Sequence, residues 1–593
     1  MGFYEGMSEN REKRSTMEYL PGVTASPGMS RGQAVLHLAP NLSFQPYAVT
    51  DVERETHRLD SAVEGAIREI ERLKRRVLAE MGEEQAHIFR SQQTILEDAA
   101  LLAEIRGRIT EFSWCAEEAV RQVFAGYLEM FAELAEGDYN KERMADLEDV
   151  HNRLLRLLLG KQGGDLSDLP ELSIVVAREL FPSDTALMER QKVAGLVTEQ
   201  GGITSHVAIL AKNLGIPAAV AVTGSTKRIQ EGADLHLDAT DPEEARVYVN
   251  PGAASRRHIE ERRDRYEERR KLLAEERHLP PVTPDGRKIT VSANIGSVEE
   301  IDSVLGVGAR SIGLFRSEFL FMQGNRLPEE ETQFRAYRRV VKAFREGHVV
   351  LRSLDVGGDK PLQAIPIPKE ANPFLGYRAV RISLDRPLLF RQQLRAALRA
   401  SAYGRLKIMF PMISGPNEVA RILAVLGEIR EELDREGIAH DQELEVGVMV
   451  EVPSAVLMAE EILRLVDFMS IGTNDLTQYL LAADRMNETI REYYQPYHPA
   501  VFRAIARVVD AAHARGKRVG ICGELAGMPP AIPALIGLGV DELSMSAQMV
   551  PEAIHIIRHT RYDEAMELAG QILTMDEEPK IKAVLQGIRT TKE

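Results

Sequence analysis

The sequence lacks the features of secreted, membrane-spanning and nucleic-acid-binding proteins. Its 593 residues include only two cysteines, Cys115 and Cys522, and they form no CxxC pair, so no disulfide framework is indicated. No run of 18 apolar residues is present, and the N-terminal region has no apolar signal-peptide core. The formal net charge of −16 argues against a basic face for nucleic acid. We therefore expect a soluble cytoplasmic protein with no membrane insertion and no nucleic-acid partner.

The composition and the spacing of apolar residues change several times along the chain, which predicts a multidomain α/β protein. A glycine-poor region with helical spacing interrupts a series of short strand-like runs, which predicts a helical bundle inserted into an α/β domain. A run rich in Arg and Glu, closed by prolines, then predicts an exposed helical linker. The expected parts are a polar N-terminal tail (1–19), an α/β domain in two pieces (20–45 and 165–250), the inserted bundle (46–164), the linker (251–280), a barrel domain (281–575) and a C-terminal tail (576–593).

From Arg287 onward, eight strand-like runs alternate with helical patterns. The runs are KITVSANI, SIGLFRS, VVLRSLDV, RLKIMFP, LEVGVMVE, FMSIGTND, RVGICGE and ELSMSA. Eight such repeats of strand and helix predict a (β/α)8 TIM barrel. In these barrels the chemistry is placed at the C-terminal ends of the strands, so the residues found there are the candidate site.

The predicted strand ends carry residues suited to a small anion and a metal ion. The arginines can bind phosphate and carboxylate oxygens, and two carboxylates can hold Mg²⁺ together with water and substrate oxygens. Cys522 is either a nucleophile or a proton donor, and the residue pattern alone leaves both roles open. The residues expected at this rim are Arg316, Arg352, Arg485, Glu451, Asn474, Asp475 and Cys522.

A second candidate site is the stretch TEQGGITSHVAILAKN, which begins at Thr198. A strand is predicted to turn at the glycine pair into a helix capped by Thr204 or Ser205 and ended by Gly215. His206 then lies in the first helical turn, where free N–H groups favour an anion such as a phosphorylated imidazole. Taken alone, the stretch fits a phosphohistidine or a histidine that merely lies near a helix cap, and a metal ligand is less favoured because no second ligand is close.

At this point the motifs resemble those of a known family, enzyme I of the bacterial phosphoenolpyruvate:sugar phosphotransferase system. The resemblance covers nearly the whole chain from about Gly22 to the end of the barrel. The sequence GGITSH is similar to the phosphohistidine motif of that family. The barrel motifs follow in order as GLFRSEFLFM, LRSLDVGGDK, NPFLGYRAVR, VGVMVEVPSA, FMSIGTNDLTQYLLAADR and GICGELAG.

The resemblance implies a phosphotransferase that moves the phosphoryl group of phosphoenolpyruvate to His206, releases pyruvate, and passes the group to a histidine of the carrier protein HPr. It implies substrate binding by Arg316, Arg352 and Arg485 and by Asn474 and Asp475, with Glu451 and Asp475 as Mg²⁺ ligands and Cys522 as proton donor. Arg378 and Lys360 match further positions near the site. The family also implies a swivelling histidine domain, an HPr-binding bundle, a homodimer formed through the barrel, and a role in sugar uptake.

Two departures and three alternatives accompany this resemblance. Ile203 stands where many members have arginine, and ELAGM lacks an acidic residue that often follows the glycine. A dikinase or synthase would need a nucleotide-binding domain, and no GxxxxGK[ST] loop is present. A nitrogen-related paralogue of enzyme I would share the chemistry but have a regulatory output. A catalytically inactive scaffold is disfavoured because the residues of the chemistry are retained.

Overall fold

A computed structural model describes residues 18–38, 42–81, 83–133, 138–161, 166, 169–185, 188–202, 205–241, 244–322, 327–358, 364–365, 367–368 and 370–592. The chain divides into two compact units, Met1–Glu267 and Glu268–Glu593. The predicted fold class is confirmed, since the protein is a mixed α/β molecule with a helical insertion and an eight-stranded parallel barrel. None of the described helices is long and apolar enough to cross a membrane.

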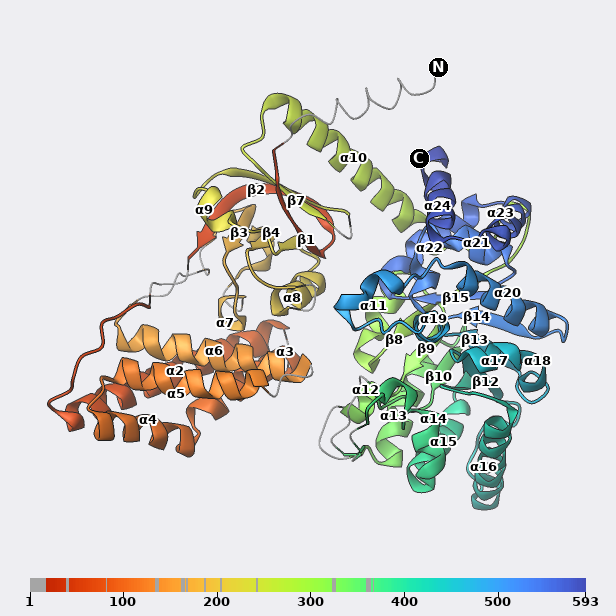
Figure 1. The fold of residues 1–593 in the computed structure, drawn as a ribbon, viewed down its shortest axis with the longest axis horizontal. Helices are drawn as coiled ribbons and strands as arrows, with labels where there is room; N and C mark the ends of the chain where they lie inside the picture. Colours follow the sequence, from red (N-terminus) through yellow and green to blue (C-terminus); the bar gives the residue numbers. More distant parts are fainter. Residues whose placement is uncertain are drawn as a thin grey trace. The chain divides into compact units, whose positions relative to one another are not determined.

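The helical insertion of the first unit is a bundle of antiparallel hairpins (Figure 1). Its apolar positions recur at helical spacing, so that Ile70, Leu73 and Val77 are buried in a common core with Phe89 and Phe124. Asp98 caps one helix by accepting from the N–H groups of the following turn. The helices are α2 (Val52–Met81), α3 (Glu83–Leu96), α4 (Ala99–Phe112), α5 (Ala116–Glu133) and α6 (Asp138–Leu158).

The strands on either side of the insertion close into one seven-stranded barrel. Their order is β1-β5-β4-β3-β2-β6-β7, and β1 also pairs with β7. Strands β2, β3, β4 and β5 run parallel, and α8 (His206–Leu214) connects β4 to β5. The strands are β1 (Leu20–Ser26), β2 (Gly28–His37), β3 (Ser173–Ala177), β4 (Val193–Thr198), β5 (Ala218–Val220), β6 (Asp234–Ala239) and β7 (Ala245–Val249).

The predicted linker is helix α10 (Ala253–Glu276), and the boundary between the two units falls within it. Of its residues only Ile259 is buried, as expected for a helix made of Arg and Glu. In the first unit, Arg262 Nη2 lies 2.9 Å from Asp238 Oδ2 on β6. In the second unit, Arg269 Nη2 lies 2.7 Å from Glu552 Oε1 on α22 (Val550–His559). Each half of α10 is thus fixed by ion pairs to its own unit.

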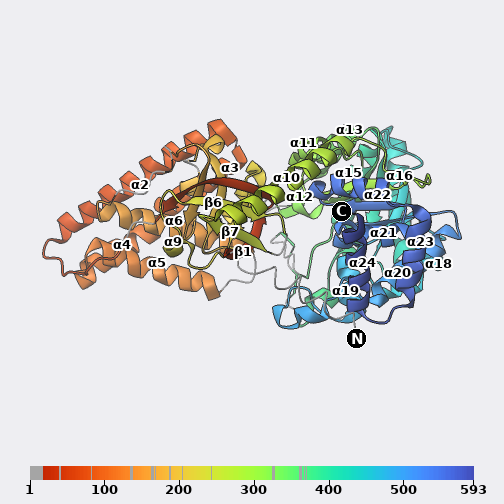
Figure 2. The same cartoon turned by 90° about the horizontal axis from the view of Figure 1, so that it is seen from above.

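All eight predicted barrel strands form, and they pair in parallel in the closed order β10-β11-β12-β13-β14-β15-β8-β9. Helices between the strands cover the outside of the barrel (Figure 2). The strands are β8 (Thr290–Ile295), β9 (Ile312–Arg316), β10 (Val349–Arg352), β11 (Leu406–Phe410), β12 (Glu445–Val450), β13 (Phe468–Ile471), β14 (Arg518–Ile521) and β15 (Glu542–Met545).

The larger barrel helices bury apolar faces against these strands, and the chain ends in a helix that does the same. The residues expected to form a C-terminal tail contain α24 (Glu578–Lys592), whose Ile581 and Leu585 are buried in the barrel core. The other large helices of this unit are α13 (Glu330–Ala343), α15 (Pro387–Ser401), α16 (Pro416–Glu436), α20 (Pro499–His513) and α23 (Tyr562–Thr574).

Candidate functional site

The structure brings the predicted barrel residues to one end of the barrel. Because all eight strands are parallel, their C-terminal ends form a single mouth. Arg316 and Arg352 are the last residues of β9 and β10, Glu451 directly follows β12, and Cys522 directly follows β14. The remaining members lie on and after α19 (Thr473–Leu481), which follows β13; they are Asn474, Asp475 and Arg485.

Two of the arginines at the mouth are held by buried carboxylates. Arg352 pairs with Glu318, whose side chain is fully buried, and with Asp355 at 2.8 Å. Arg378 Nη2 lies 3.1 Å from both Asp355 and Asp475. Burial opposes the charge on both guanidinium groups, but the carboxylates outweigh it and raise the pKa of Arg352 and of Arg378. Both arginines therefore stay charged and fixed before any ligand arrives.

Arg316 differs from these arginines because, within the described part of the chain, no carboxylate lies within ion-pair distance of it. Its guanidinium lies over the ring of Phe319, with 4.8 Å from Cζ to the ring centroid. Burial lowers the pKa of Arg316, and Glu318 and Arg352 act on it in opposite directions. A half-buried cation in this state gains from an incoming anion, so Arg316 is suited to bind phosphate or carboxylate.

The carboxylates of Glu451 and Asp475 form the part of the mouth suited to a cation. Glu451 Oε1 accepts from the Met412 N–H at 2.6 Å, and Met412 holds a positive φ of 56°. Burial raises the pKa of Glu451 to about 8, and the charges of Asp475 and Asp355 add to this effect. Asp475 Oδ1 is buried without a hydrogen-bond partner among the described residues, although Arg485 Nη2 lies 3.6 Å away. A divalent cation would relieve this repulsion, which fits Mg²⁺.

The first turn of α19 adds backbone donors to the site. Because Leu476 N–H is the first to bond within the helix, to Gly472 O, the N–H groups of the preceding residues have no intrahelical acceptor. Asn474 turns its side chain to Glu524, donating to Oε1 at 2.9 Å and accepting from the Glu524 N–H at 2.8 Å. This leaves the backbone of Asn474 and Asp475 as the part suited to an anion.

Cys522 is a buried thiol at the inner edge of the mouth, with 4 % of its surface exposed. Burial raises its pKa to about 12, although Ser470 and Arg352 act in the opposite direction. At neutral pH the group is therefore protonated, which favours a proton donor over a thiolate nucleophile.

The histidine turn has the local form that the sequence predicts. Helix α8 begins at His206, and Ser205 is the capping residue, accepting from the Ala208 N–H at 3.4 Å. Gly215 ends the helix with a φ of 64°, and Gly201 before the turn has a φ of 105°. Ile203 and Thr204 lie outside the described residues, as does the side chain of His206. The turn thus offers unpaired helical N–H groups beside His206.

Several groups of the mouth were not singled out from the sequence. Glu318 and Asp355 lie two and three residues after Arg316 and Arg352, respectively, and Tyr479 accepts from Arg378 Nη1 at 3.2 Å. Only the short spacing of Glu318 and Asp355 from an arginine at a strand end marked these two carboxylates, and no sequence signal marked Tyr479. Lys360 lies outside the described residues.

A separate group of potential metal ligands lies on α10 and α22. Glu276, His555 and His559 place one ligand atom each within 4.8 Å of one another. These groups already bond to one another and to neighbours, since His555 Nδ1 lies 2.7 Å from Glu276 and His559 Nδ1 lies 2.8 Å from the His555 carbonyl oxygen. Arg269 Nη1 lies 2.7 Å from His555 Nε2, and its charge disfavours a second cation. The cluster therefore anchors the end of α10.

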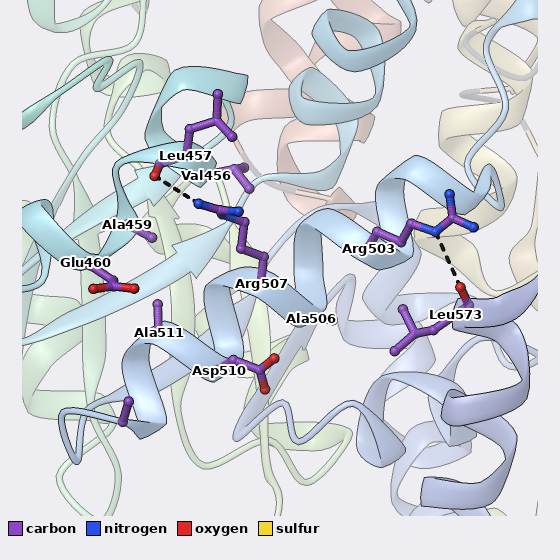
Figure 3. Close-up of a pocket in the computed structure, with 11 residues that line it drawn as sticks. Val456, Leu457, Ala459, Glu460, Arg503, Ala506, Arg507, Asp510, Ala511 and Leu573 are labelled. Atoms are coloured by element: carbon purple, nitrogen blue, oxygen red, sulfur yellow. Dashed lines mark hydrogen bonds between the residues drawn. The ribbon is translucent and has the colours of Figure 1, made fainter.

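A hollow of about 730 Å³ lies on the outside of the barrel, and no predicted site residue lines it (Figure 3). It lies among α17 (Pro453–Leu457), α18 (Ala459–Ile462), α20 and α23. Arg507 and Arg503 bond at its rim to the carbonyl oxygens of Leu457 and Leu573. It does not contribute to the barrel mouth.

Comparison with known proteins now identifies the family. The profile described as "PEP-utilising enzyme, PEP-binding domain" matches residues 270–562, "PEP-utilising enzyme, N-terminal" matches 21–143, and "PEP-utilising enzyme, mobile domain" matches 169–241. A phosphoenolpyruvate-protein phosphotransferase of Bacillus sp. (strain S) is 43% identical over 554 residues, covering 93% of this chain and 95% of that protein. The chain belongs to the phosphoenolpyruvate-protein phosphotransferase family.

Other relatives extend this match. The Bacillus subtilis (strain 168) protein of that name is 41% identical over 570 residues, which are 96% of this chain and 99% of that protein. A solved structure described as "NMR solution structure of Enzyme I (nEIt) protein using two 4D-spectra" is 35% identical and covers 42% of this chain and 99% of that chain, with a TM-score of 0.38. The sequence identities to the Bacillus phosphotransferases confirm the expected membership of this family, whereas the role of each site residue stays a prediction.

Proposed function

We propose that the protein transfers the phosphoryl group of phosphoenolpyruvate to His206, releases pyruvate, and then passes the group to a histidine of HPr. The observation that carries this proposal is the barrel mouth, where fixed arginines and two crowded carboxylates surround a buried thiol. Such a site suits a small ligand that bears both phosphate and carboxylate. None of the described residues that we place at the mouth is a histidine, and His206 at the start of α8 supplies the phosphoryl acceptor.

In the proposed reaction, Arg316, Arg352 and Arg485 bind the anionic oxygens of phosphoenolpyruvate, and the backbone of Asn474 and Asp475 completes the contacts. We expect Arg316 to gain the most from the ligand's charge, because it is half-buried, lies over the ring of Phe319 and has no carboxylate within ion-pair distance among the described residues. Phosphoryl transfer depends chiefly on such positioning and charge stabilisation.

Glu451 and Asp475 would hold Mg²⁺ at the mouth. When bound, the ion neutralises charge on the transferring phosphoryl group. The fit rests on two features of the chain, the raised pKa of Glu451, to about 8, and the buried Asp475 Oδ1 without a hydrogen-bond partner among described residues.

The bonds of the reaction balance without a further reagent. A ring nitrogen of His206 forms a bond to phosphorus while the bond from phosphorus to the enol oxygen breaks, leaving the enolate of pyruvate. The enolate then takes the proton of the Cys522 thiol on its methylene carbon, and a thiolate remains until solvent returns the proton. A neutral buried thiol is suited to this donation.

The wider role extends the same proposal. The bundle α2–α6 is the expected docking site for HPr. The protein is expected to lie in the cytoplasm and to supply phosphoryl groups for sugar uptake. A homodimer through the barrel is expected, and the exposed Leu457 at the rim of the outer hollow is one apolar residue available for it. The alternative is a nitrogen-related paralogue with the same chemistry and a regulatory output, which the identity of the downstream phosphoryl acceptor would distinguish.

The test is labelling with ³²P-phosphoenolpyruvate. With Mg²⁺ and without ATP, we expect an acid-labile phosphoprotein that transfers its label to added HPr. Chelation of the metal abolishes labelling if the ion is required. Labelling that needs ATP, or that persists in His206→Ala, would overturn the proposal.

A further inference from the structure

The backbone of Cys522 is hydrogen-bonded on the side of β13, but on the side of β15 the residue lies one position beyond the last paired residue of β14. Its N–H donates to the carbonyl oxygen of Ile471 at 3.1 Å. On the other side, the pairing of β14 with β15 runs through Gly520↔Glu542 and Ile521↔Leu543. The Cys522 carbonyl group comes one residue later, where it needs another donor.

Asn294 supplies that donor from β8, one strand further round the barrel. Its Nδ2 donates to the Cys522 carbonyl oxygen at 3.1 Å and lies 3.5 Å from the Ser544 carbonyl oxygen. Its Oδ1 accepts from the Ser544 hydroxyl at 2.6 Å. A flipped amide would direct Oδ1 at two carbonyl oxygens, so this network permits one orientation.

An asparagine at this place needs an explanation, because the interiors of these barrels are usually filled by branched apolar side chains. Cys522 itself packs in an apolar cluster with Leu314, Val350, Met409, Met449 and Phe468. Asn294 is half-buried, and withdrawing its amide from water is unfavourable unless the amide is hydrogen-bonded. The side chain of Asn294 hydrogen-bonds to Cys522, which carries the thiol, and to Ser544, which fixes the orientation of the Asn294 amide.

We propose that Asn294, oriented by Ser544, is a positioning residue that fixes Cys522 for protonation of the enolate. The inference rests on the proposed role of Cys522. With both backbone groups held, the thiol moves only by rotation about its side-chain bond, so its proton is presented to one face of the substrate. The Cys522 Sγ itself donates to the Ile471 carbonyl oxygen at 3.8 Å, so rotation about the Cα–Cβ bond is the one movement that turns the thiol proton towards a substrate.

The protonation step provides a measurable quantity, its selectivity for one face of C3, that would not change if Asn294 only stabilised the fold. The π electron pair of the enolate forms the new C3–H bond, the S–H bond breaks, and the C2–O bond becomes a carbonyl. A fixed donor adds the proton to one face of C3, whereas protonation of released enolate by water has no facial preference. Facial selectivity therefore reports the position of the thiol separately from phosphoryl transfer.

The experiment uses phosphoenolpyruvate labelled stereospecifically with deuterium at C3, turned over in tritiated water with Mg²⁺ and HPr, followed by analysis of the chirality of the pyruvate methyl group. Asn294→Leu keeps the size of the side chain but removes its donor. We expect it to lose most facial selectivity and to slow turnover by about 10²-fold, while His206 is still labelled in a single turnover. Ser544→Ala should act in the same direction more weakly.

Matched controls separate the possible outcomes. Ser292→Ala removes a hydroxyl of the same strand that bonds to Glu542 at 2.5 Å rather than to Asn294, and it should keep selectivity. If Cys522→Ala is as selective as the unmodified protein, the proposed donor is wrong. If Cys522→Ala loses selectivity but Asn294→Leu and Ser544→Ala keep it, only the role of Asn294 is overturned. Ser544→Ala also serves if Asn294→Leu does not fold.

Discussion

The barrel mouth and the histidine turn, the two candidate anion sites, are built in different ways. The mouth uses charged side chains, of which Arg352 and Arg378 are buried and bonded to carboxylates before any ligand arrives. The turn uses backbone, with Ser205 capping the helix and leaving N–H groups of α8 beside His206. The mouth is therefore fixed and strongly charged, whereas the turn offers only the partial charges of a few backbone N–H groups.

This difference matches the tasks that we propose for the two sites. A site that stabilises transition-state charge benefits from fixed, desolvated groups, because they need no rearrangement during the reaction. A carrier that must release its phosphoryl group again is better served by a few helical N–H groups and a dipole of modest strength. The comparison predicts severe losses when a charged side chain of the mouth is removed and mild ones when the helix cap beside His206 is removed.

The largest expected effect is that of Arg352→Met. It removes the cation from the buried ion pairs of Arg352 with Glu318 and Asp355, so we expect a loss of about 3–5 kcal/mol in the free energy of unfolding of the barrel unit. Phosphorylation by phosphoenolpyruvate should fall by more than about 10³-fold. Urea denaturation and single-turnover labelling measure the two effects.

The double variant Arg352→Met with Glu318→Gln is the matched control for this change. It should regain part of the stability, because one buried negative charge is removed together with the Arg352 cation, but none of the activity. Recovery of activity in the double variant would contradict a direct role for Arg352 in substrate binding.

The next effect is that of Cys522→Ala, which tests the mouth without disturbing its charges. The thiol carries no charge at neutral pH, since burial raises its pKa to about 12, so the fold should be kept. We expect turnover to fall by about 10²–10⁴-fold, as for loss of a general acid. Near-normal turnover would remove Cys522 from the proton-donor role.

A third prediction concerns a buried histidine of the bundle and its dependence on pH. Burial, with a contribution from Arg121, lowers the pKa of His151 to about 4, against an ordinary value of 6.5. Between these values the unfolded chain binds the additional proton, so stability is full above pH 6.5 and is lost as the pH falls towards 4. The bundle should lose about 2 kcal/mol of unfolding free energy between pH 7 and pH 5 through this residue.

The single tryptophan of the chain, Trp114, lies between α4 and α5 and reports on this bundle. Urea titrations followed by its fluorescence at the two pH values provide the measurement. His151→Leu should remove that part of the pH dependence, and an unchanged pH dependence in the variant would assign the effect to other groups.

The smallest effect is expected at the histidine turn. Ser205→Ala removes the cap of α8 and should cost about 1 kcal/mol of local stability. Amide hydrogen exchange in α8 should become about fivefold faster, while Ser205→Asp, which keeps an acceptor, should not show this change. Equal exchange in Ser205→Ala and the unmodified protein would show that the cap does not stabilise the helix.

The positions of the site residues were predictable because they follow from periodicity and strand direction. Eight runs predict eight parallel strands, and parallel strands place Arg316, Arg352 and Cys522 at one mouth. The pairings were not predictable, since Asp355 bridges Arg352 and Arg378, which lie on separate segments, through side-chain packing that no local pattern records. Asn294 was missed because it looks like one polar residue in an ordinary strand.

The end of the chain illustrates the same limit. Residues 576–593 carry mixed charges and were expected to form a tail, yet Ile581 and Leu585 are buried against the barrel. Two apolar residues four positions apart are a weak helical signal on their own. They stabilise a helix only when another part of the protein offers an apolar surface against which they can pack.

The central claim is that the barrel mouth and His206 act in one reaction, and one measurement tests it most directly. In a single turnover with excess protein and Mg²⁺, both pyruvate and phosphohistidine are quantified, and the phosphorylated residue is located by peptide mass spectrometry. The account predicts equal amounts of the two products with the phosphoryl group on His206. Pyruvate without phosphohistidine, or phosphate on another residue, would contradict it.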